Sequence, residues 1–308
     1  MIEKIYNIEL NLDNYIGKDL YSDGDIEDKL LEIVKEHSEE DFNRIIKESK
    51  SWPILYHLSH IRGNIVDWLP ITKQDTVLEV GAGCGAITGT LAKKAKSVTC
   101  IDLSKKRSMI NAYRNKNSDN ITIHVGNFED IEKKLHDKYN FITLIGVFEY
   151  GEKYINTKNP YVDFLKVMRN HLADDGKIII AIENKYGLKY WAGCQEDHNG
   201  KFFEGIEGYP STYGAKTFSR KELIQIVQDS GYIVKDFYYP YPDYKLPVMI
   251  YSDQFLPRIG ELNLNIRNFD AERFLLFDEQ KVYDGLIKNG MFQEFSNSYL
   301  VIIEKERT

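Results

Sequence analysis

The segment at residues 77–92, VLEVGAGCGAITGTLA, constrains the fold of this chain more than any other. It begins with a short apolar run, which is typical of a strand covered on both faces of a sheet. Gly81, Gly83 and Gly85 follow, and they predict a turn whose backbone can approach a ligand closely. Apolar residues at helical spacing come next, so the turn leads into a helix whose first N–H groups are unpaired. The segment therefore predicts a nucleotide-type cofactor site.

The same letters fit two classes of cofactor. Gly81-x-Gly83-x-x-Ala86 also satisfies the dinucleotide pattern G-x-G-x-x-G/A, so an NAD-binding oxidoreductase is an alternative. Glu79, two residues before the first glycine, and the additional Gly85 favour a different class. In the form E-x-G-x-G-x-G, the segment resembles motif I of the class I S-adenosylmethionine (SAM) methyltransferases.

Polar residues follow the next two predicted strands. The strand at 97–103 carries Asp102, an acid placed to accept hydrogen bonds from ribose hydroxyls. The strand at 121–125 leads to Asn127 and Phe128, which the resemblance implies reach the adenine. The family usually has aspartate where Asn127 stands. An asparagine in a turn beside a core phenylalanine is the alternative interpretation.

Residues 52–70 are predicted to form a helix before the first core strand. The resemblance implies that this helix closes over SAM, with Tyr56 and Arg62 holding the methionine carboxylate. An ordinary amphipathic helix that packs inward is the alternative. The residues expected to bind the cofactor are Tyr56, Arg62, Glu79, Gly81, Ala82, Gly83, Asp102, Leu103, Asn127 and Phe128.

Strand and helix patterns alternate along the rest of the chain, which predicts a parallel sheet with helices on both faces. Further strands are expected at 141–148, 176–182, 233–239 and 298–304. The resemblance implies that the last strand runs antiparallel between the fifth and sixth. We predict an α/β fold with a doubly wound, mostly parallel, seven-stranded sheet of the Rossmann-like class I methyltransferase type. A helical cap is expected at 1–70, and a methyltransferase domain at 71–308 with acceptor-side insertions at 186–216 and 240–297.

The acceptor is expected beyond the fourth and fifth strands, because open α/β sheets bind ligands outside the carboxyl ends of their strands. The family often has a histidine after the fourth strand, where this chain has Tyr150. The catalytic candidates are Glu149, Tyr150, Glu183, His198 and Tyr213. The candidate anchors for an anionic acceptor are Lys185, Lys189, Arg220 and Tyr213.

Two other features concern the insertions. The run Glu196-Asp197-His198 is interpreted as an exposed polar loop, so no metal site is expected. Residues 186–256 are rich in aromatic side chains, including Tyr238, Tyr239, Tyr241 and Tyr244. These rings either recognise a peptide or saccharide surface or pack the insertions onto the sheet.

Composition limits the partners and the location. A net charge of -7 and a pI of about 5.6 disfavour a nucleic-acid acceptor, which needs basic side chains to neutralise phosphates. The chain has no apolar run long enough for a membrane span, and its first residues lack the apolar region of a signal peptide. We therefore expect a cytoplasmic protein.

Motif strings between residues 52 and 305, among them YHLSHIRGNIVDWLP and AIENKYGLKYWAG, resemble a subgroup of class I methyltransferases from bacterial biosynthetic clusters. The resemblance implies SAM-dependent O-methylation of a biosynthetic intermediate. The first hypothesis is the C-terminal carboxylate of a lanthipeptide-like peptide, since a carboxylate is already ionised at pH 7. A sugar hydroxyl in surface polysaccharide synthesis is the second. A noncatalytic interaction subunit with the SAM fold is a third.

Overall fold

The computed structural model describes residues 1–19, 22, 24–265 and 273–306. By their internal contacts the residues divide into two compact units. The first unit comprises residues 1–144 and 170–177, and the second comprises residues 145–169 and 178–308. Each unit is described by itself below.

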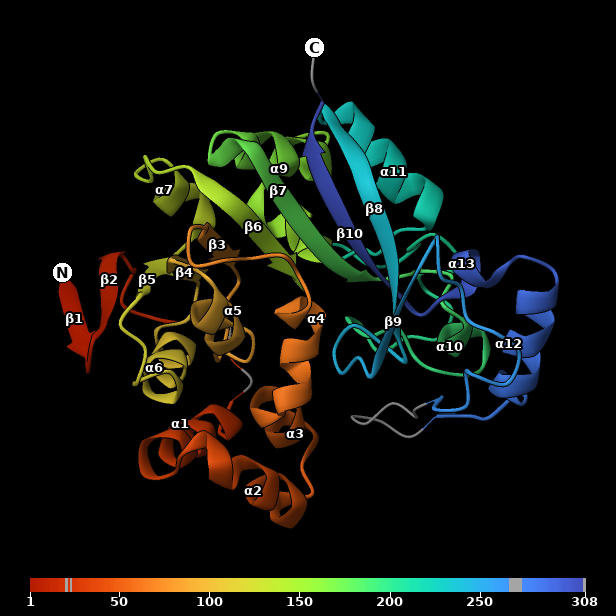
Figure 1. Ribbon diagram of the computed structural model, residues 1–308, viewed down its shortest axis with the longest axis horizontal. Helices are drawn as coiled ribbons and strands as arrows, with labels where there is room; N and C mark the ends of the chain where they lie inside the picture. Colours follow the sequence, from red (N-terminus) through yellow and green to blue (C-terminus); the bar gives the residue numbers. More distant parts are fainter. Residues whose placement is uncertain (20–21, 23, 266–272, 307–308) are drawn as a thin grey trace. The chain divides into compact units, whose positions relative to one another are not determined.

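The first unit contains the strands of the glycine-turn segment and its neighbours (Figure 1). Its strand order is β1-β2-β5-β4-β3-β6. The strands are β1 (Ile2–Ile5), β2 (Ile8–Asn14), β3 (Thr76–Val80), β4 (Ser97–Asp102), β5 (Ile121–Gly126) and β6 (Tyr139–Ile145). β3 pairs in parallel with both β4 and β6. From β3 the chain adds β4 and β5 on one side, and then returns to add β6 on the other side of β3. Open α/β sheets bind their ligands where the strand order switches in this way.

Short helices connect these strands and precede them. They are α1 (Ile26–Glu36), α2 (Phe42–Ser49), α3 (Trp52–Leu58), α4 (Asn64–Asp67), α5 (Thr88–Lys94), α6 (Lys105–Arg114) and α7 (Phe128–Glu132), with the 3-10 turns η1 (Glu39–Asp41) and η2 (His60–Gly63). The single helix predicted at 52–70 is therefore wrong in detail. α3 ends at Leu58, and Ser59 begins η2 by accepting a hydrogen bond from the Ile61 N–H at 3.3 Å.

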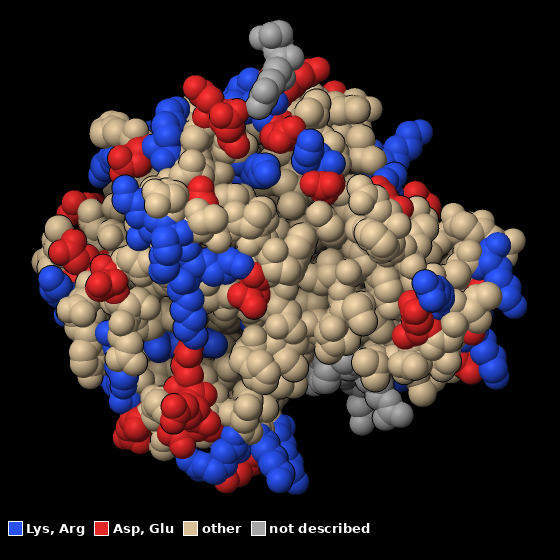
Figure 2. All heavy atoms as spheres, in the orientation of Figure 1, with Lys and Arg blue, Asp and Glu red and all other residues tan. Residues whose placement is uncertain are grey.

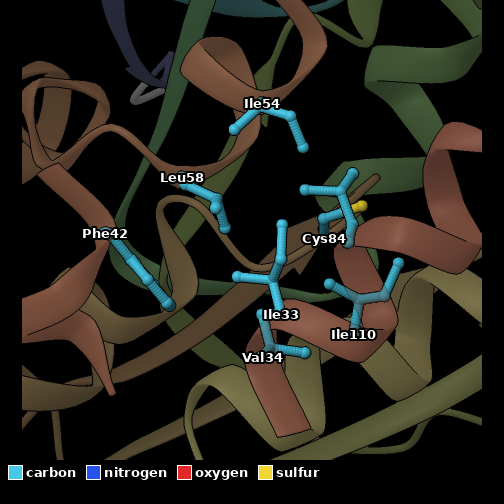
Figure 3. Packing of buried hydrophobic residues seen from close by; sticks show 8 residues of the cluster. Ile33, Val34, Phe42, Ile54, Leu58, Cys84 and Ile110 are labelled. Carbon is cyan, nitrogen blue, oxygen red and sulfur yellow. The ribbon is translucent and has the colours of Figure 1, made fainter. Parts of the chain in front are cut away.

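An apolar cluster fastens the N-terminal helices to the glycine turn (Figure 3). Cys84, within the turn, is 2 % exposed and belongs to the same cluster as Ile110 of α6. The other members come from α1, α2 and α3, namely Leu30, Ile33, Val34, Phe42, Ile54 and Leu58. The N-terminal helices therefore pack against the glycine turn through this cluster.

The second unit has the strand order β7-β10-β8-β9. The strands are β7 (Leu172–Glu183, of which residues 178–183 belong to this unit), β8 (Tyr232–Tyr241), β9 (Met249–Ser252) and β10 (Ser298–Lys305). Its helices are α8 (Gly151–Tyr154), α9 (Pro160–Arg169), α10 (Leu188–Trp191), α11 (Arg220–Asp229), α12 (Glu279–Lys288) and α13 (Phe292–Phe295), together with the turn η3 (Phe148–Tyr150). β10 lies between β7 and β8 and runs antiparallel to β8, as predicted for the last strand.

The predicted α/β fold with a mostly parallel sheet is confirmed, and the seven predicted strands correspond to β3–β8 and β10. Within the described residues three strands were not predicted: β1, β2 and β9. β1 and β2 lie in the region expected to be only a helical cap, and β2 pairs in parallel with β5. No helix in the described ranges is long and apolar enough to cross a membrane.

Candidate functional site

The glycine turn of the first unit has an open side and a crowded side. Gly85 has a φ of +74°, and a Cβ added there would lie 2.4 Å from Oδ1 of Asn111, so only glycine fits. Gly83 also has a positive φ, +53°, but its nearest neighbour would be the Arg107 guanidinium at 3.9 Å. A Cβ at Gly83 would thus make a single ordinary van der Waals contact, so the backbone there is far less crowded than at Gly85 and a ligand can approach it closely.

Asp102 lies at the end of β4 and holds the turn in place. Its Oδ2 accepts a hydrogen bond from the Gly83 N–H at 2.7 Å, and its Oδ1 accepts one from the Ser104 N–H at 2.9 Å. The residue is 9 % exposed, and burial raises the pKa of its carboxyl while nearby Arg107 opposes that shift. Each carboxylate oxygen can accept a further hydrogen bond. These residues therefore fit a ribose whose hydroxyls donate to Asp102 beside Gly83.

Glu79, at the end of β3, is a buried carboxylic acid. Its Oε2 accepts a hydrogen bond of 2.6 Å from the Thr88 hydroxyl at the start of α5, and the Cys100 thiol lies 3.5 Å away. The side chain is 4 % exposed, and burial raises the pKa of its carboxyl to about 7. Glu79 thus joins β3, β4 and α5 around the glycine turn. Thr88 was not singled out in the sequence.

Four further residues predicted to bind the cofactor form two pairs, Arg62 with Tyr56 and Asn127 with Phe128. Arg62 of η2 is 5 % exposed, and its guanidinium lies 4.2 Å from the ring centroid of Tyr56 in α3, so this predicted pair is brought together. Asn127 instead caps α7, where its side chain accepts a hydrogen bond from the Glu129 N–H at 3.2 Å. Phe128 is 2 % exposed within the core.

Three residues complete the predicted cofactor set. Ala82 and Gly81 both donate backbone hydrogen bonds to the carbonyl of Ile101 in β4, at 3.1 and 2.8 Å. These bonds fix the turn against the neighbouring strand. Leu103 is half-buried and follows Asp102 directly.

In the second unit, four of the five catalytic candidates come from three separate segments. Glu149 and Tyr150 lie in η3, Glu183 ends β7, and His198 follows α10. One ligand atom each from Glu149, Glu183 and His198 lies within 4.8 Å of the others. The ring of Tyr150 packs edge-on against the His198 ring, with 5.4 Å between centroids. Tyr213, the fifth candidate, is 90 % exposed.

The interpretation of 196–198 as an exposed polar loop is wrong. The side chains of Glu196 and His198 are only 3 % and 6 % exposed. Glu196 accepts hydrogen bonds from the backbone N–H groups of His198 and Asn199, at 2.8 and 3.0 Å, and its Oε1 lies 2.8 Å from Nδ1 of His198. Hydrogen bonding within the loop compensates for burying these polar groups.

The lysines and arginine proposed as anchors for an anion already have acidic partners. Lys185 pairs with Glu222 at 2.6 Å, and Arg220 pairs with Asp253 at 2.9 Å. Lys189 lies between two carboxylates, at 2.9 Å from Asp197 and 2.8 Å from Asp243. Lys245, which the sequence did not single out, contacts Glu183 and lies 2.8 Å from Asp197.

The tyrosines of the insertions mostly pack inward. Tyr239, Tyr241 and Tyr244 are 0–4 % exposed. The hydroxyl of Tyr241 donates to Asn265 at 3.1 Å and accepts from the Leu264 N–H at 2.7 Å. These contacts favour packing of the insertions over a tyrosine-lined recognition surface, which was the other interpretation.

Comparison with known proteins gives a consistent result. A family model described as a methyltransferase domain matches residues 30–235. The chain is 32% identical over 157 residues to an uncharacterized methyltransferase of Staphylococcus carnosus, covering 51% of this chain and 70% of that protein. It is 24% identical over 214 residues to the ribosomal RNA small subunit methyltransferase A of Mycoplasma mobile, covering 69% of each.

Among solved structures, a SAM-dependent methyltransferase from Archaeoglobus fulgidus matches with a TM-score of 0.50 and 13% identity. That match covers 83% of this chain and all of the other. At this level of identity it shows a shared fold.

Proposed function

Since the chain belongs to the methyltransferase-domain family and its cofactor is SAM, we propose that it is an O-methyltransferase whose acceptor presents a neutral hydroxyl. SAM supplies a methyl group on a positively charged sulfur. The residues of this chain then have to hold the cofactor, align the acceptor oxygen with the methyl carbon, and exclude water.

The cofactor part of the proposal rests on the first unit. The backbone of Gly83 is uncrowded, and Asp102 offers acceptor positions beside it at the end of β4. Arg62 and Tyr56 form a second polar group on the helices before β3, which suits the methionine carboxylate. In this proposal Glu79, Gly81, Ala82 and Leu103 shape the turn, while Asn127 and Phe128 shape the loop after β5.

We expect Asp102→Ala to weaken SAM binding by tenfold or more, because two charge-assisted hydrogen bonds from the ribose would be lost at about 1.5–3 kcal/mol each. Asp102→Asn keeps one oxygen acceptor and should lose less. Calorimetric titration with SAM measures both. Equal affinity of the wild type and Asp102→Ala for SAM would show that the ribose does not bind to the Asp102 carboxyl.

The acceptor part rests on one observation in the second unit: acidic side chains predominate, and the basic ones are ion-paired. Five carboxylates, from Glu149, Glu183, Glu196, Asp197 and Asp243, share this region with the ammonium groups of Lys189 and Lys245. An acceptor carboxylate would be repelled there, whereas a hydroxyl can donate a hydrogen bond to a carboxylate. The charge distribution therefore favours the glycan-type hydroxyl over the peptide carboxylate that the sequence placed first.

Charge also argues against a nucleic-acid acceptor, which we do not propose despite the ribosomal RNA relative. The net charge is -7. Figure 2 shows a run of basic side chains on the left of the face in view, and it leads directly into acidic ones. Such mixed charge is a poor match for a phosphate backbone.

Product chemistry tests the choice of acceptor. We expect methylated product from a panel of saccharide acceptors to survive mild alkali as a methyl ether. A peptide with a free C-terminal carboxylate serves as the comparison, because its methyl ester would release methanol under the same treatment. Alkali-labile product from the peptide, with no turnover of saccharides, would reject the hydroxyl proposal and restore the carboxylate.

A further inference from the structure

We propose that Glu149, Glu183 and His198 form a binding site for one divalent metal cation of the Mn²⁺ or Zn²⁺ type in the second unit. The three residues reach the same place from η3, from the end of β7 and from the segment after α10. One imidazole and two carboxylates are donors that both ions accept.

The spacing of the donor atoms suits one ion. The ligand atoms of the three residues lie within 4.8 Å of one another. Ligand bonds of about 2.0–2.2 Å place two donors of one ion at most about 4.4 Å apart. Three donors in tetrahedral coordination lie closer together, about 3.4 Å apart, so side-chain movements of about 1 Å would close the site.

Unsatisfied buried oxygens point to a missing cation. Glu149 is 1 % exposed and Glu183 is 0 % exposed, and in each carboxyl the Oε2 atom accepts no hydrogen bond. Leaving such an atom buried without a partner costs about 1–3 kcal/mol, and more in a charged group. A bound cation would satisfy both oxygens at once.

The contact between the second ring nitrogen of His198, Nδ1, and a carboxylate is typical of a metal-bound histidine. Its Nδ1 lies 2.8 Å from Oε1 of Glu196, whose other oxygen is held by the N–H groups of His198 and Asn199. If Nδ1 carries the proton and donates it to Glu196, the lone pair of Nε2 faces Glu149, at 3.6 Å. That separation is too long for a good hydrogen bond, and a carboxylate behind a ligating imidazole is a common arrangement.

The balance of charge supports a cation as well. With His198 neutral, the five carboxylates exceed the two ammonium groups of Lys189 and Lys245 by three charges. One divalent ion leaves a single net negative charge among these groups. The net charge of the group therefore stays negative. Lys245 contacts Oε1 of Glu183, which leaves Oε2 for the ion.

The test uses the whole chain, untagged, after treatment with a chelator. Calorimetric titration with MnCl₂ and, separately, with ZnCl₂ should show one site per chain, and electron paramagnetic resonance should show bound Mn²⁺. Glu149→Gln and Glu183→Gln should each abolish that site. Glu196→Gln should weaken it by about 10- to 100-fold, since that residue only orients the imidazole.

Glu132→Gln is the matched control, because Glu132 lies 3.3 Å from the buried His171 and, among the described residues, no third metal ligand joins this pair. Its metal affinity should equal that of the wild type. SAM binding serves as the folding check for every variant, and His198→Gln replaces any glutamate variant that fails it. The absence of a stoichiometric site, or a site that survives loss of either glutamate, would overturn the proposal. Methyl transfer enters none of these measurements, so that outcome would leave the proposed function standing.

Discussion

Gly83→Val should lower the affinity for SAM by more than about 100-fold while the chain stays folded. The Cβ of the valine would meet only the Arg107 guanidinium, at 3.9 Å, so the side chain fits the protein but would block the close approach of SAM to the backbone of residue 83. A φ of +53° also strains a β-branched residue by about 1–3 kcal/mol. Calorimetric titration with SAM measures the affinity, and circular dichroism checks the fold.

Gly290→Val provides the matched control. Gly290 has a φ of +65°, and a Cβ added there would have no atom within 4 Å, so this variant carries a similar strain far along the chain from the turn. Its SAM affinity should stay within about threefold of the wild type. Loss of SAM binding in both variants, or in neither, would contradict the assignment of the Gly83 turn as the cofactor site.

Glu79→Gln should stabilise the chain at pH 8 and have little effect at pH 5. Burial raises the pKa of Glu79 to about 7 in the folded chain, above its ordinary value of 4.5. Between pH 4.5 and pH 7 the Glu79 carboxyl is protonated in the folded state but ionised in the unfolded state. The free energy of unfolding therefore falls as the pH rises through this range, and the loss is complete above pH 7. A shift of this size corresponds to at most about 3 kcal/mol. Glutamine removes the charge and can still accept the hydrogen bond from Thr88.

Urea unfolding of both proteins at pH 5 and pH 8 measures the difference. Glu36→Gln makes the same substitution at an exposed site in α1, so its effect should be small and similar at both pH values. A difference between Glu79→Gln and the wild type that does not grow from pH 5 to pH 8 would show that Glu79 is not protonated in the folded chain at neutral pH.

The central strands were predictable because each is a short apolar run bounded by turn residues. The capping box of Ser219 and Glu222 was also found at the start of α11, where both reciprocal hydrogen bonds are present. β2 was missed although Ile8, Leu10 and Leu12 alternate with polar residues, a sign of a half-buried strand. β9 has no such alternation, and its residues are exposed or only partly buried, so its place as a strand depends on pairing with β8.

Glu149 and Glu183 could be assigned to the acceptor side from the ends of the fourth and fifth strands, but the packing of His198 against them could not be predicted from the sequence. Glu149, Glu183 and His198 are separated along the chain, and local patterns carry no information about which loops meet. The polar residues at 196–198 indicated an exposed loop, because hydropathy does not take into account the hydrogen bonds that allow polar side chains to be buried. Burial of His198 depends on Glu196 within the same loop and on Glu149 from a distant one. The capping role of Asn127, by contrast, was one of the two interpretations open from the start.

β2 has to wait for its parallel partner β5 during synthesis of the first unit. β2 ends at residue 14, and its parallel partner begins at residue 121. At about 5–20 residues per second, a ribosome needs roughly 5–20 s to make the intervening chain. Until then β2 has only its hairpin partner β1, and an isolated hairpin is marginally stable in water. Ile8 and Leu10, fully buried in the finished fold, thus lack the β5 part of their final packing throughout that interval.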